Sequence, residues 1–365
     1  MTIQRETVSK PTGKRIVWVD IAKAIGILCV ILTHMECNTD IASSLYSPFF
    51  LVIFFFTAGY VYRHREGFGA FLKKKTIQLF IPWLLYSILQ IIASNVLTFH
   101  EHMPFWEEMK WNFLQIRGQH DGMWFIAALF VFFMPFYFFI KWYVKSPKKR
   151  LVPLVVTSFV LSLISNLYMI YMDPNVLPWG TARLPWHLED IFPAMFFMVL
   201  GYLFRQHWEE LFDRRIAGKR VVILTVFYTA FALLNLLFTD QSLQLLLVFY
   251  RYAVNFLGLA AIIAICKRIK ENRFLLFVGQ NTLNYFGLHG KVFTVIQVLL
   301  HKIPFYSVIL GSRALSLLFS IPLTLFIGVL LIPLAMFVNR FLPFLAGKGF
   351  RYDWKKKPSS AEKKK

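Results

Sequence analysis

The sequence predicts an all-α fold, a polytopic bundle of helices that crosses a membrane. Of its 365 residues, 57% are hydrophobic and only 16% are charged, whereas a soluble domain carries roughly 25% charged residues. Mean hydropathy is +0.56, and apolar runs of about 20 residues, the length that crosses a hydrocarbon layer, recur along the chain. Because the backbone must satisfy its own hydrogen bonds in lipid, such runs favour transmembrane helices.

About ten transmembrane helices are expected, with both termini in the cytoplasm. The last apolar run contains Pro322 and Pro333 and is predicted to be one tilted, kinked span. Residues 1–340 should therefore form one ten-helix membrane domain, and residues 341–365 a basic cytoplasmic tail close to anionic membrane lipid. The expected spans are 16–36, 45–62, 76–97, 123–141, 151–172, 184–204, 221–238, 243–266, 274–299 and 307–338.

The net charge of +21 is explained by this topology. Most of the 40 Lys and Arg residues fall on the segments expected inside the cell, as is usual for membrane proteins, so nucleic acid is not an expected partner. The three cysteines show no spacing typical of disulfides or metal ligands. The pair His100 and His102 lacks a suitably spaced third ligand, and no metal cofactor is expected.

The first span carries three ionisable residues, Asp20, Lys23 and His34, within an otherwise apolar run. A charge at the centre of an inserted helix costs about 2.5–3.5 kcal/mol, so such residues usually face the protein interior or water. Lys23 and His34 are eleven positions apart, which places them on one face of a helix, about 16 Å apart along its axis. We therefore expect this face to line a polar passage.

Each of these side chains has two interpretations. His34 can act as a general base that accepts a proton from a hydroxyl group, or it can be a buried histidine that bonds to a neighbouring helix. Lys23 can bind a phosphate-bearing ligand that enters from the cytoplasm, or it can form an i,i+3 ion pair with Asp20. Asp20 itself is a candidate for orienting Lys23 or contacting substrate.

A second group of polar residues precedes the sixth span. Its apolar run is too short to cross the membrane unless the helix begins near residue 184, which brings His187, Glu189 and Asp190 into the outer membrane layer. With Arg183, these residues could bind a polyhydroxylated acceptor. The alternative is an ordinary polar start of a helix.

The remaining candidates are cationic. The loop residues Lys73, Lys74 and Lys75 could hold the phosphates of a nucleotide-like donor, although the positive-inside rule also explains such a run. Arg251 and His289 lie within expected spans and are candidate substrate contacts.

The arrangement of these motifs resembles the acyltransferase-3 family of integral membrane acyltransferases, and particularly its fucose 4-O-acetylase-like branch. The likeness begins at WVDIAKAIGILCVILTH, where ten residues separate a basic residue, Lys23, from His34. It continues in order through FFFTAGY, GMWFIAAL, LPWHLEDIFPAMFFMVLGYLF and VGQNTLNYFGLHG.

This resemblance implies an acetyl-CoA-dependent O-acetyltransferase in the bacterial plasma membrane, acting on a hydroxyl group of a cell-envelope sugar or polysaccharide. It implies that His34 is the catalytic base and that Lys23 lies on the donor side. Many relatives carry a closely spaced arginine pair before the third helix, where this chain has Lys75 and Gln78 instead. The alternative function is a transporter or flippase for an envelope glycan or lipid, whose pathway would also need buried polar residues.

Overall fold

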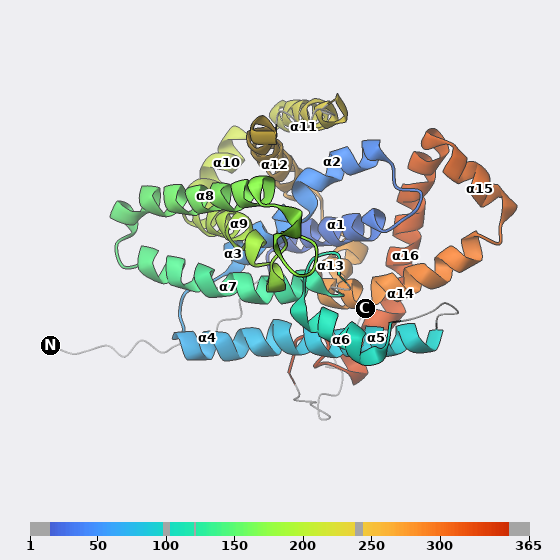
Figure 1. Cartoon of the computed structure of the whole chain (residues 1–365). Helices are drawn as coiled ribbons and strands as arrows, with labels where there is room; N and C mark the ends of the chain where they lie inside the picture. Colours follow the sequence, from blue (N-terminus) through green and yellow to red (C-terminus); the bar gives the residue numbers. More distant parts are fainter. Residues whose placement is uncertain (1–14, 98–102, 120–121, 238–243, 350–365) are drawn as a thin grey trace, which may run out of the picture.

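The computed structural model describes residues 15–97, 103–119, 122–237 and 244–349, which form helices and connecting turns without a strand (Figure 1). This confirms the predicted all-helical bundle. The α-helices are α1 (Val17–Thr33), α2 (Asp40–Phe50), α3 (Val52–Val61), α4 (Phe68–Lys75), α5 (Ile81–Leu97), α6 (Phe105–Leu114), α7 (Trp124–Tyr143), α8 (Pro147–Tyr171), α9 (Ile191–Leu203), α10 (Glu209–Arg215), α11 (Lys219–Leu233), α12 (Gln244–Cys266), α13 (Arg273–Gln280), α14 (Thr282–Leu300), α15 (Pro304–Gly311) and α16 (Arg313–Phe341). Short 3₁₀ or π segments are η1 (Thr76–Phe80), η2 (Pro174–Val176), η3 (Pro185–Asp190), η4 (Phe204–Trp208) and η5 (Leu234–Leu237).

Eight helical segments of the described residues are long and apolar enough to cross a membrane, fewer than the ten spans expected. A ninth is reached if α14 and α15, which are bent by 107° at their junction, count as one span. The expected span 274–299 is broken at Asn281 between α13 and α14, and the expected span 307–338 begins later, at Arg313. α1 ends before its C-cap His34 and has 17 residues, which correspond to about 25 Å of helix. The expected span 16–36 is therefore shorter in the structure.

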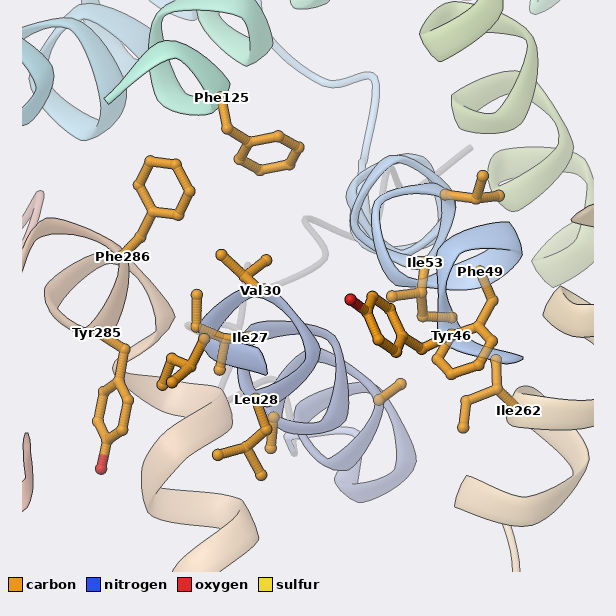
Figure 2. Packing of buried hydrophobic residues seen from close by; sticks show 14 of the residues in the cluster. Ile27, Leu28, Val30, Tyr46, Phe49, Ile53, Phe125, Ile262, Tyr285 and Phe286 are labelled. Carbon is orange, nitrogen blue, oxygen red and sulfur yellow. The ribbon is translucent and has the colours of Figure 1, made fainter. Parts of the chain in front are cut away.

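α1 lies near the middle of the bundle and contacts helices α2, α3, α12, α13, α14 and α16 (Figure 1). Figure 2 shows Ile27 of α1 on the side of Tyr285, while Ile53 packs on the other side of the helix. α13 approaches α1 so closely that a Cβ atom at Gly279 would lie 1.8 Å from the Asp20 carbonyl oxygen. Polar groups of α1 can therefore face cavities inside the bundle.

α3 and α9 pack backbone to backbone through two glycines. A Cβ atom at Gly59 would lie 1.8 Å from the carbonyl oxygen of Met198, and one at Gly201 would lie 1.9 Å from that of Phe56. Small residues allow such close approach between membrane helices, where dispersion and weak polar contacts replace hydrophobic driving force. The end of α3 lies beside the start of α1, where the rings of Tyr60 and Trp18 have centroids 4.8 Å apart.

The first part of the expected tail packs on the bundle. Leu345 is 2% exposed, and Lys348 Nζ donates to Asn339 Oδ1 of α16 at 2.7 Å. The division between a membrane domain at 1–340 and a tail at 341–365 stays a prediction, and residues 350–365 of that tail lie outside the described residues.

Candidate functional site

Three adjoining cavities run along α1 from Lys23 to His34. We name them the basic mouth, of about 410 Å³, the apolar passage, of about 260 Å³, and the polar chamber, of about 440 Å³. The mouth and the passage share Val19, Lys23 and Val61 in their walls, and the passage and the chamber share Phe286. The two ends of the bundle are called the Lys23 end and the His34 end below.

The basic mouth gathers cations from separate parts of the chain. Arg15 precedes α1, Arg63 follows α3 and Arg205 lies in the π-helical segment η4, and all three line the mouth together with Lys23. Lys23 Nζ lies 2.8 Å from Asp20 Oδ1, so the i,i+3 ion pair is present. Four cations around one carboxylate make the mouth attractive to a polyanion.

The apolar passage lies between the mouth and the polar chamber and shares wall residues with both. Its walls are aliphatic and aromatic apart from Lys23 and the polar groups of Thr57, Gln78 and Thr282. At its far end the rings of Phe125 and Phe286 approach one another beside Val30, with centroids 5.8 Å apart (Figure 2). An extended, weakly polar molecule would lose little by leaving water for such a channel.

Two histidines lie side by side at the start of the polar chamber. His34 caps the C-terminal end of α1, and its ring centroid lies 5.2 Å from that of His289 of α14. His289 Nδ1 lies 2.9 Å from the Phe286 carbonyl oxygen and 3.1 Å from that of Tyr285. Carbonyl oxygens only accept, so this nitrogen carries the proton and Nε2 is left as an acceptor. The predicted candidates His34 and His289 thus lie together.

The rest of the chamber is lined by polar side chains that the sequence prediction missed. Ser87, Gln90 and Ser94 lie on one face of α5, and Gln90 Nε2 donates to the Gly287 carbonyl oxygen at 2.8 Å. The spacing of these three residues, three and then four positions, is the signal that could have revealed this polar face. Further lining residues come from α6, α7 and α14: Glu108, Asn112, Trp124, Lys291 and Thr294.

The predicted acceptor cluster is present, but it lies beside the chamber. Arg183 Nη1 is 3.4 Å from Glu189 Oε1 and 3.8 Å from Asp190 Oδ2, and Glu189 is buried. None of the cluster residues lines the chamber, although the His187 ring lies 5.1 Å from that of Trp124, which does. The cluster therefore contacts the chamber wall through one aromatic residue.

The cluster is built on an irregular turn. The segment η3 has positive φ at Trp186 (57°) and His187 (55°), so the expected regular helix start near residue 184 is instead a 3₁₀ turn. Atoms of His187, Glu189 and Asp190 lie within 4.8 Å of one another, close enough to share a metal ion. Arg183 pairs with both carboxylates, and this cation competes with a metal for them.

The structure places the other predicted cations away from the three cavities. Lys74 Nζ lies 3.2 Å from Glu66 Oε1, and Lys75 Nζ lies 3.4 Å from the centre of the Phe133 ring. Lys73 is exposed on the same turn of α4. Arg251 lines a separate cavity, described below.

The family comparison identifies a domain over most of the chain. Residues 16–340 match the model of a family described as "Acyltransferase domain". This range includes every residue that lines the apolar passage and the polar chamber. No curated protein and no solved structure matches the chain.

Proposed function

Because the chain belongs to the acyltransferase-3 family, and is thus a membrane acyltransferase, we propose that it transfers acetyl from acetyl-CoA to a hydroxyl group. The acceptor is a sugar or polysaccharide of the cell envelope, as the resemblance to the fucose 4-O-acetylase-like branch implies, and the membrane is the bacterial plasma membrane. The observation that carries the proposal is the row of adjoining cavities from four cations to two histidines. The transporter alternative is not favoured, because the family match covers every residue that lines the apolar passage and the polar chamber.

The distribution of charge along the donor matches that of the mouth and the passage. CoA carries several phosphate charges at one end, which suit Lys23, Arg63 and Arg205, and a thioester on a long, weakly charged arm at the other. The arm suits the apolar passage and would bring the thioester to the junction at Phe286. His34 lies on the other side of that junction.

The proposed reaction is direct transfer assisted by one base. His34 removes the proton of the acceptor hydroxyl as its oxygen attacks the thioester carbonyl carbon. The carbon–sulfur bond then breaks, the CoA thiolate leaves, and protonated His34 returns its proton to that sulfur. The products are an acetyl ester and CoA with a free thiol, and His34 is again neutral.

The acceptor fits the chamber by the variety of its polar groups. A sugar presents hydroxyl groups in several directions, and hydroxyls, amides, a carboxylate and an ammonium line the chamber. Trp124 adds an aromatic face, on which the apolar face of a sugar ring can pack. His289 Nε2, an acceptor in this tautomer, can hold a hydroxyl group next to His34.

The test is acetyl transfer by the purified protein in detergent. Released CoA thiol and acetylated product are measured with acetyl-CoA and envelope sugars or oligosaccharides as acceptors. His34→Gln should lower both signals by about 10²–10⁴-fold, whereas His301→Gln should not, since His301 is exposed outside the chamber and pairs with Glu36. Wild-type rates in His34→Gln would refute the assignment of the base, and the absence of transfer from acetyl-CoA by the wild-type protein would refute the donor.

A further inference from the structure

A fourth cavity, of about 590 Å³, lies at the His34 end on another side of the bundle. It is formed by α2, α11, η5 and α12, and it shares no lining residue with the polar chamber. α1 ends just before His34 and α2 begins at Asp40, so both cavities lie at the same end of the bundle. The lining residues of this Arg251 cavity are Asp40, Ser43, Ser44, Ser47, Pro48, Ala232, Asn235, Leu236, Tyr250, Arg251, Val254 and Asn255.

The cavity is polar partly because α2 contains a proline. Pro48 has no N–H group, so the Ser44 carbonyl oxygen, four residues earlier, has no helical donor. The Asn255 amide, oriented to satisfy both of its polar ends, donates to the Pro48 carbonyl oxygen at 2.9 Å and thereby holds α12 against α2. Three serines of this irregular helix, Ser43, Ser44 and Ser47, line the cavity.

Opposite charges line the cavity without neutralising one another. Arg251 and Asp40 both contribute to its wall, yet within the described ranges neither forms an ion pair, with the other or with any third residue. Ser44 and Ser47 add two hydroxyl groups. A molecule that carries a phosphate and an ammonium a few bonds apart would satisfy both charges at once.

The elements around the cavity expose apolar side chains next to its polar ones. Ile41 of α2 is 38% exposed, Leu236 of η5 is 40% exposed and Phe249 of α12 is 47% exposed. In a bilayer such side chains contact acyl chains, so a ligand with a polar head and apolar tails can reach this cavity from the lipid.

We propose that the Arg251 cavity binds the headgroup of phosphatidylethanolamine. The phosphate lies against the Arg251 guanidinium and accepts hydrogen bonds from Ser44 and Ser47. The primary ammonium donates to the Asp40 carboxylate and to the Ser44 carbonyl oxygen that Pro48 leaves without a helical donor. A choline headgroup has no N–H to donate, and a glycerol headgroup has no positive charge for Asp40.

The experiment is native mass spectrometry of the full-length protein in detergent, titrated with one lipid at a time. Phosphatidylethanolamine should bind at least about tenfold more tightly than phosphatidylglycerol or phosphatidylcholine. Free phosphoethanolamine at the same concentrations should bind far more weakly than the lipid. If phosphatidylglycerol binds equally well, the cavity does not select a zwitterionic headgroup and the proposal is wrong. If free phosphoethanolamine binds equally well, the ligand need not be a lipid, and the proposal is again wrong.

Matched variants locate the binding site. Arg251→Gln should weaken phosphatidylethanolamine binding roughly tenfold or more, whereas Arg313→Gln, which removes an exposed cation at the same end outside the cavity, should leave it unchanged. Asp40→Asn should abolish the preference over phosphatidylglycerol and retain binding of both lipids. Equal effects of the two arginine variants, or an unchanged lipid preference in Asp40→Asn, would overturn the proposal.

Discussion

The basic mouth and the polar chamber lie at opposite ends of α1 and differ in how they are built. The charge of the mouth is mainly positive, because Arg15, Lys23, Arg63 and Arg205 surround a single carboxylate, that of Asp20. The chamber mixes neutral amides and hydroxyls with one carboxylate, one ammonium and two histidines. A cationic site holds a polyanion at long range and with little geometric precision, whereas a mixed polar site selects a ligand by the position of each hydrogen bond. The two halves therefore suit a charged donor and a neutral, hydroxylated acceptor.

The largest expected effect separates chemistry from binding. His34→Gln should lower kcat by about 10²–10⁴-fold, the usual contribution of a positioned general base. Acetyl-CoA binding should be nearly unchanged, because the mouth is at the other end of α1. Transfer rates and equilibrium binding of acetyl-CoA to the same preparation measure the two quantities. A parallel loss of binding would show that the two halves are not independent.

The next effect tests the mouth against the lysine run of α4. Arg63→Gln should raise the KM for acetyl-CoA about ten- to a hundredfold, since a charge-assisted hydrogen bond to phosphate contributes about 1.5–3 kcal/mol. Lys74→Gln should leave it unchanged, because Lys74 pairs with Glu66 outside the mouth. Steady-state kinetics at several salt concentrations would measure both. A larger effect of Lys74→Gln on this KM would contradict donor binding in the mouth and indicate that the donor binds at α4.

A smaller effect tests the chamber. Trp124→Leu should raise the KM for the acceptor about two- to tenfold, because contacts with an aromatic face contribute about 0.5–1.5 kcal/mol beyond area burial. The KM for acetyl-CoA should stay the same, since Trp124 lines the chamber and not the passage. Initial rates with each substrate varied in turn give both constants. An effect confined to acetyl-CoA would contradict the division into halves.

The smallest effect concerns the junction. Phe286→Leu keeps an apolar side chain but removes the aromatic contact with Phe125. Slow hydrolysis of acetyl-CoA without acceptor should rise by a few-fold, because more water reaches the thioester. Release of CoA thiol in the absence of sugar measures this leak, and a rate equal to that of the wild type would show that Phe286 does not limit water.

The prediction from the sequence was strongest where one helix carries the signal. Asp20 and Lys23 lie on α1 and His34 caps its end, and helical spacing alone predicted that Lys23 and His34 line one site. The polar walls of the chamber come from α5, α6, α7 and α14, and single serines or amides in apolar runs are too common to single out. Basic runs carry less information for a similar reason, because topology alone places lysines at the inner membrane surface. The predicted donor role of Lys73, Lys74 and Lys75 stays a prediction.

The count of spans and the acceptor cluster show the limits of local reasoning. The break at Asn281 and the bend after α14 depend on packing against α1 and α16, which hydropathy does not report. The sequence identified the residues of the cluster around Arg183, but it did not predict the positive φ angles of η3 or that the cluster lies outside the chamber, next to Trp124. Its role as an acceptor site stays a prediction.

The ring contact between Phe125 and Phe286 has a consequence for the membrane as a whole. A membrane protein with a hydrated cavity at each face of the bilayer can let protons leak across and so dissipate the proton gradient. Protons move along chains of hydrogen-bonded water, and an apolar constriction such as the one at the tilted rings of Phe125 and Phe286 is unfavourable for such a chain. If the proposed donor and acceptor lie on opposite sides of the membrane, this constriction separates their two cavities and limits proton leakage during transfer.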